Sequence, residues 1–140
     1  MNETTYGSSV TIPLSYEAAV EHTTAALKQE GFGVLMSIDV KQTLKQKLDI
    51  DFRKYVILGA CNPPLAHRAL QAELDIGLLL PCNVIVYESG PTQSVVAVMA
   101  PISMIAIVGE NPALAAVARE ADERLRRALE SLERELVSNP

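Results

Sequence analysis

The chain has 140 residues, which is the length of one domain, and we expect a single domain over residues 1–140. A formal net charge of −5 and the lack of a Lys/Arg cluster argue against a nucleic-acid partner, because phosphate binding depends on basic side chains. The apolar runs at 76–86 and 95–108 are too short and too interrupted by proline for a bilayer, so we expect no membrane partner and a cytoplasmic protein with free thiols.

The first thirty residues predict a strand followed by a helix. Residues 3–12 have the composition of a strand, which Pro13 ends. Ser15 is a suitable N-cap for a helix over 16–30, in which apolar residues recur three and four positions apart. Gly31 stands where a helix C-terminus favours a left-handed residue.

Two strands and a short helix are expected in the next thirty residues. Residues 33–40 alternate in hydrophobicity, which predicts a half-buried strand. Asp39 can cap a short helix over 41–48, and residues 49–54 form a polar link. The apolar run 55–61 predicts a further strand.

A helix and a hairpin are expected next. Asn62 followed by two prolines predicts the start of a helix over 63–73, because proline fits the first helical turn. Residues 78–88 predict a long strand, in which Pro81 indicates an edge or a bulge. After a short turn, residues 94–99 return as the second strand of an antiparallel hairpin.

The last forty residues contain one clear element. Residues 102–109 fit either a strand or a helical turn, whereas Asn111 and Pro112 mark the start of a long amphipathic helix. The whole pattern predicts an α+β protein. We expect a mostly antiparallel sheet of about five strands, helices packed on one face, and a long C-terminal helix.

Two Cys-Asn pairs, each beside an apolar run, are the candidate site. Cys61 and Cys82 are either small buried residues or thiols that contact a ligand. Cys61 precedes a helix N-terminus, which lowers the pKa of a thiol and can hold an anion. Asn62 is an N-cap candidate, whereas Asn83 in an apolar strand needs a hydrogen-bond partner or a ligand.

His67 and Glu73 are weaker candidates. Cys61, His67 and Cys82 lack the spacing of a zinc site and a fourth ligand, so no metal is expected. Glu73 and Asp75 either form an acid/base pair or are solvated carboxylates at a helix end. The sequence contains neither a nucleotide-binding motif nor a nucleophile elbow, and no cofactor is expected.

Three stretches carry a family resemblance: GFGVL at 31–35, ILGACNPPLAHRAL at 57–70 and IGLLLPCNV at 76–84. Residues 16–134 resemble the domain of unknown function 302 family, although Ala100 stands where the family often has an acidic residue. The resemblance implies an α+β fold like that of the TATA-box-binding protein, a homodimer, and proximity of the two cysteine segments around a pocket. It implies no established activity.

Three functions stay open. The first is a homodimeric small-ligand-binding or sensing module with an apolar pocket. The polar groups that contact the ligand would be those of Cys61, Asn62, Cys82 and Asn83, with His67 and Glu73 as further candidates. The second is a thiol-dependent redox or sulfur-handling enzyme with Cys61 as nucleophile and Cys82 as its resolving partner. The third is a structural or regulatory dimer without a small-molecule site.

Overall fold

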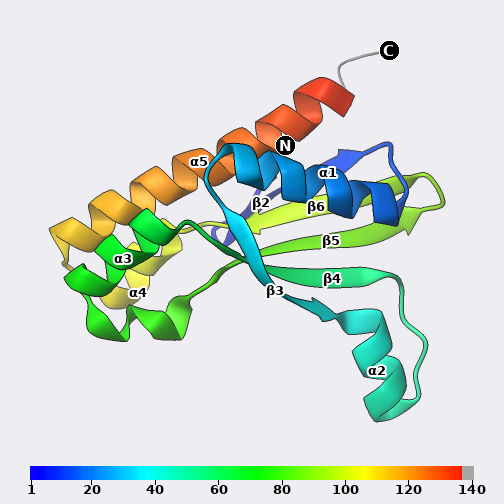
Figure 1. Ribbon diagram of the computed structural model, residues 1–140, viewed down its shortest axis with the longest axis horizontal. Coiled ribbons are helices and arrows are strands. Elements are labelled where there is room, and N and C mark those ends of the chain that lie inside the picture. Colours follow the sequence, from blue (N-terminus) through cyan, green and yellow to red (C-terminus); the bar gives the residue numbers. More distant parts are fainter. Residues whose placement is uncertain (137–140) are drawn as a thin grey trace.

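Six strands form one antiparallel sheet in the computed structural model, which describes residues 1–136 (Figure 1). Their order across the sheet is β1-β2-β6-β5-β4-β3. The strands are β1 (Asn2–Glu3), β2 (Gly7–Ile12), β3 (Gly33–Asp39), β4 (Tyr55–Cys61), β5 (Cys82–Gly90) and β6 (Gln93–Met99). The expected α+β class and antiparallel sheet are confirmed, with one strand more than expected because the first predicted strand is divided by a turn at residues 4–6.

Two long helices, α1 (Tyr16–Gln29) and α5 (Pro112–Leu136), lie on the same side of the sheet (Figure 1). The shorter helices are α2 (Val40–Leu48), α3 (Pro63–Ala72), the 3₁₀ helix η1 (Leu74–Leu79) and α4 (Ser103–Val108). Within residues 1–136, no helix combines the length and apolarity that crossing a bilayer requires.

The core lies between the sheet and the two long helices. Val10, Val96, Val86 and Val56 lie opposite one another in successive strand pairs, and all four are buried. Because side chains alternate along a strand, this row faces α1 and α5 while the neighbouring residues face the other way. The core is aliphatic, as the scarcity of aromatic residues requires.

The N-caps expected for four helices are all present. Each cap residue accepts a hydrogen bond from a backbone N–H three positions later. The pairs are Ser15 and Ala18 (3.4 Å), Asp39 and Gln42 (2.9 Å), Asn62 and Leu65 (3.3 Å), and Asn111 and Leu114 (3.1 Å).

The prediction of one strand over residues 78–88 is wrong at its start. The 3₁₀ helix η1 extends to Leu79, the Leu80–Pro81 peptide bond is cis, and β5 begins at Cys82. Pro81 has no N–H for a strand ladder, so the ladder begins after it. As a result β5 is a central strand between β4 and β6, and the edge or bulge expected at Pro81 is not part of it.

In two further segments the structure differs from what the hydrophobicity pattern predicts or leaves open. Residues 102–109, which fitted a strand or a helical turn, contain the short helix α4. Strand β3 is an edge strand rather than a half-buried one, and its Met36 and Ile38 are 56% and 48% exposed. Helix α2 follows β3 directly, buries no residue, and projects away from the rest of the molecule (Figure 1).

Candidate functional site

An apolar cavity of about 360 Å³ lies where the ends of β4 and β5 meet α3, α4 and α5. The residues around it are aliphatic, aromatic or sulfur-containing, apart from the amide of Asn62, and none is charged. Phe32 and Leu65 form part of the wall near β3 and α3, and Met104 and Val117 form part of it on α4 and α5. This composition suits an uncharged apolar molecule.

Asn62 is held in place by its own side-chain hydrogen bonds. Its Oδ1 accepts from the backbone N–H of Leu65, and its Nδ2 donates to the carbonyl oxygen of Glu30 at 3.4 Å. Arg124 Nη1 donates to the same carbonyl at 3.3 Å. The amide therefore joins α3 to the end of α1, and the expected N-cap role is confirmed.

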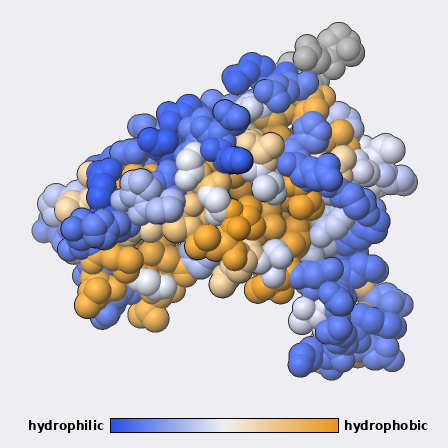
Figure 2. Space-filling view, viewed as in Figure 1, coloured by the Kyte–Doolittle hydropathy of each residue, from blue (hydrophilic) through white to orange (hydrophobic). Residues whose placement is uncertain are grey.

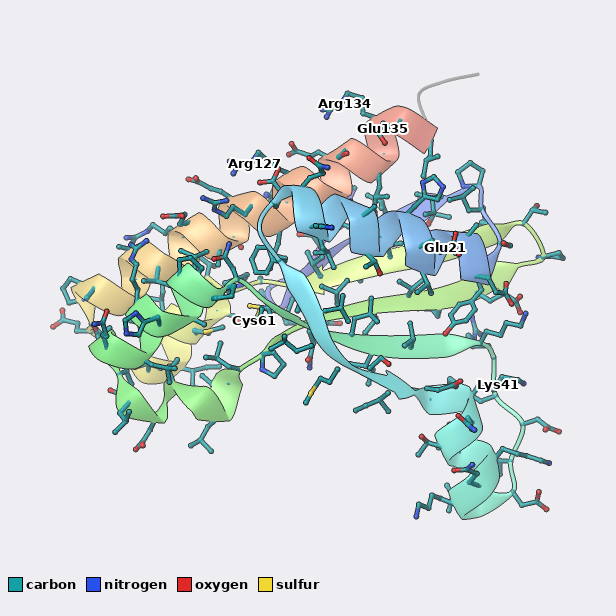
Figure 3. The ribbon with its side chains drawn as sticks, viewed as in Figure 1. Glu21, Lys41, Cys61, Arg127, Arg134 and Glu135 are labelled. Atoms are coloured by element: carbon teal, nitrogen blue, oxygen red, sulfur yellow. The ribbon has the colours of Figure 1, made fainter. Side chains whose placement is uncertain are left out.

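Both cysteines line this cavity, and both are free thiols. In the β4–β5 pairing Cys82 lies opposite Ala60, so Cys61 is one residue further along the neighbouring strand. Cys61 is half-buried at the end of β4, close to where β3 crosses, and lies apart from the labelled charged residue Arg127 on α5 (Figure 3).

The two thiols differ in their surroundings. Cys82 is 7% exposed, and burial followed by the influence of Cys61 raises the pKa of its thiol from an ordinary 9.0 to about 11. A thiol with this pKa is almost entirely protonated at neutral pH, whereas nucleophilic and redox chemistry needs the thiolate. Cys82 is therefore poorly suited to act as a resolving thiolate.

The remaining candidates lie elsewhere. Asn83 is exposed on the other face of the sheet, opposite Gly59, and borders a separate hollow of about 320 Å³. His67 is exposed on α3 and is not among the residues around the cavity. Glu73 is the C-terminal cap residue of α3 and borders a small hollow beside η1 and α4. The structure thus brings together Cys61, Asn62 and Cys82.

A metal centre is not supported by the described residues. Among residues 1–136 there is no group of three or more His, Cys, Asp or Glu side chains placed to hold a metal ion. The ring of His67 is not part of the cavity that Cys61 and Cys82 share.

Sequence reasoning missed several residues that shape the cavity. Met36 and Met104 add two thioether sulfurs to the two thiols, and Ala118 and Ala121 form part of the wall on α5. The small side chains were a usable signal, because alanines within the apolar stripe of a long helix leave space that larger residues would fill. Met104 could not be placed while residues 102–109 fitted both a strand and a helix.

Fold and cavity together define a small α+β protein with one antiparallel sheet and an apolar site at one end of it. The model of the family described as Domain of unknown function DUF302 matches residues 8–132, and the chain belongs to this family. The family assignment made from the sequence is thereby confirmed.

A solved structure supports the same assignment. The chain is similar to the crystal structure of an uncharacterized conserved DUF302 protein from Bacillus stearothermophilus, with 31% sequence identity and a TM-score of 0.82. The similarity covers 92% of this chain and 99% of that one. No curated protein matches the sequence. The fold is therefore shared with this relative, and neither the family description nor that of the relative assigns an activity.

Proposed function

We propose that the protein is a small-ligand-binding module that holds a neutral, apolar molecule in the cavity at the end of the sheet. The carrying observation is the cavity itself, whose volume of about 360 Å³ falls within the range of small-molecule sites. Liquid water occupies roughly 30 Å³ per molecule, so this space has the volume of about a dozen water molecules, which suits a small ligand. The absence of charged side chains around it disfavours an ionised ligand, which would be desolvated without a partner.

The sulfur atoms around the cavity narrow the chemical class. Cys61, Cys82, Met36 and Met104 supply four polarizable groups to one small space. Sulfur makes favourable contacts with aromatic ring edges, and methionine adapts its shape to irregular partners. A small aromatic molecule, or a similarly polarizable one, fits this lining best.

The alternatives receive less support. The raised pKa of Cys82 disfavours the thiol-dependent enzyme with Cys82 as resolving residue. A purely structural role does not explain the cavity, since natural protein cores are normally packed with few voids. Two thiols beside an apolar site also suit the reducing cytoplasm, where we expect the ligand to be bound.

Fluorescence titration with the neutral probe 1-aminonaphthalene, a two-ring molecule small enough for this cavity, tests the proposal. Ala66→Phe places a ring into the cavity from the half-buried Ala66 on α3, and Ala116→Phe adds the same ring on the exposed side of α5. We expect saturable binding to the native protein, at least about tenfold weaker binding to Ala66→Phe, and unchanged binding to Ala116→Phe.

Urea unfolding of both variants establishes that they are folded. Protection of Cys61 from alkylation by saturating probe gives a second readout at the cavity wall. The absence of saturable binding to the native protein, or equal binding to Ala66→Phe, would contradict the proposal.

A further inference from the structure

The sheet face turned away from α1 and α5 is uncovered, and most of it is apolar. One row of residues crosses five strands on this face, each opposite the next: Ser9, Ala97, Ile85, Ile57 and Ile38. Sheet faces that meet water normally carry polar side chains at such positions. In the view of Figure 2, where α1 lies in front of the sheet, hydrophobic side chains gather around β3 next to the hydrophilic surface of α2.

A parallel row contains two aromatic residues. Thr11, Val95, Tyr87 and Tyr55 lie opposite one another on the same face. The rings of Tyr55 and Tyr87 are stacked, with centroids 5.4 Å apart and planes 8° apart. None of the residues in the two rows is itself charged, and the one guanidinium that lies over them in residues 1–136, that of Arg53, is 5.8 Å from the centroid of the Tyr87 ring.

This face has a ridge on one half and a hollow on the other, so the faces of two copies have complementary shapes. At the β3 edge, the exposed Met36 and Ile38 form a ridge, because they lie opposite Gly59 and Ile57 on this face. On the other half, over β2, β6 and β5, lies the hollow of about 320 Å³, which Tyr6 and Asn83 border. A two-fold axis in the plane between two facing sheets, parallel to the strands, places each ridge over the hollow of the other copy.

Helix α2 adds an independent reason for a partner. It has nine residues and buries none of them, and isolated helices of fewer than about 12 residues are marginal in water. It continues directly from the ridge and projects on the side away from α1 and α5 (Figure 1). Its Leu48 is 63% exposed and available for contact.

We propose that a second copy of this chain docks face to face on this surface, with each Met36–Ile38 ridge seated in the hollow of the other copy. The five strands β2 to β6, about 4.8 Å apart and about 20 Å long, give roughly 500 Å² for each copy, or about 1,000 Å² in total. Specific interfaces begin at about this size, and α2 adds to it. The interface does not depend on the cavity ligand, since only Met36 belongs to both surfaces.

Sedimentation velocity over a concentration series tests this interface with two matched variants. Ile38→Lys puts a charge on the ridge, and Ile107→Lys makes the same change at a residue that is 67% exposed on α4. We expect a dimer for the native protein, a dissociation constant raised at least about tenfold by Ile38→Lys, and no change for Ile107→Lys. Circular dichroism verifies that both variants are folded.

Photo-crosslinking identifies the facing surface directly. Benzoylphenylalanine at position 38 should join the two copies through a peptide that contains Tyr6, Asn83 or Val95. A native protein that stays monomeric at high concentration overturns the proposal. A dimer that Ile107→Lys dissociates and Ile38→Lys does not would also overturn it. A crosslink to α4 or η1 would do the same, because each result places the contact on another surface.

Discussion

The side-chain amide of Asn62 donates a hydrogen bond to the carbonyl oxygen of Glu30, 3.4 Å away. The same amide caps α3, so one buried side chain fixes the beginning of one helix against the end of another. Asn111 repeats the arrangement, capping α5 and donating to the carbonyl oxygen of Ala72 at 3.0 Å. Each asparagine therefore uses both halves of its amide in the structure.

Asn62→Ala should lower the free energy of unfolding by about 1–2 kcal/mol, because it removes both the cap and the bond to Glu30. Asn62→Ser should lower the free energy of unfolding by about half as much, since serine is also a good N-cap but cannot reach the carbonyl of Glu30. Urea unfolding of the two variants measures the difference. Equal losses would show that the bond to Glu30 contributes nothing.

Gly31→Ala should be destabilising by at least about 1 kcal/mol, because Gly31 has φ +82°, where a side chain is strained. A Cβ there would also lie 2.9 Å from Nδ2 of Asn62. Gly33→Ala is the matched control, since its Cβ meets no heavy atom within 4 Å. Thermal unfolding that shows similar losses in both variants would contradict this account.

Thr23→Val should raise the free energy of unfolding by up to about 1 kcal/mol. Thr23 is 1% exposed, and within residues 1–136 its hydroxyl has no hydrogen-bond partner, so valine keeps the shape and removes a desolvated polar group. Ser94→Ala is the contrasting variant, because the buried hydroxyl of Ser94 donates to the carbonyl oxygen of Leu14 at 2.9 Å. Ser94→Ala should lower the free energy of unfolding by about 1 kcal/mol. Chemical denaturation of both variants tests whether one is stabilised and the other destabilised.

Cys82 should make the native protein less stable at alkaline pH. Its thiol has a pKa of about 11 in the folded protein and an ordinary value of 9.0 when unfolded, so above pH 9.0 only the unfolded state loses the proton. The two pKa values predict a loss of about 2–3 kcal/mol as the pH rises from 9 to 11, and no effect below 9.

Urea unfolding of the native protein and of Cys82→Ala across this pH range tests the effect. The stability difference between the two proteins should shrink by the stated amount, and parallel pH profiles would refute the raised pKa. In native protein near neutral pH, Cys82 should also be alkylated more slowly than the half-buried Cys61.

Local signals in the sequence predicted the local structure well. Ser15, Asp39, Asn62 and Asn111 were recognisable as caps because an N-cap depends on residues within one turn of it. The run from Leu78 to Leu80 was not assignable in the same way. A short apolar stretch satisfies a buried strand and a 3₁₀ turn equally, and only the surrounding structure decides between them.

The candidate site was predictable only in part. Cys61 and Cys82 border one cavity at the ends of β4 and β5, and the repeated Cys-Asn pattern pointed to both. The same pattern included Asn83, but adjacent residues of a strand face opposite sides of the sheet, so Asn83 and Cys82 are separated by the sheet itself. The contribution of Met36 depends on the pairing of β3 with β4, which hydrophobicity alone does not reveal.

The strand order also determines when the sheet can be completed during synthesis. Strand β2 pairs with β6, so Gly7 lies opposite Met99. Strand β2 is synthesised early but can pair only after β6, the last strand, has been synthesised. Loop closure over such a separation is entropically costly, and sheets dominated by distant pairings fold slowly. We therefore expect the emerging chain to expose its N-terminal strand until β6 has left the ribosome, a period in which chaperones have access to it.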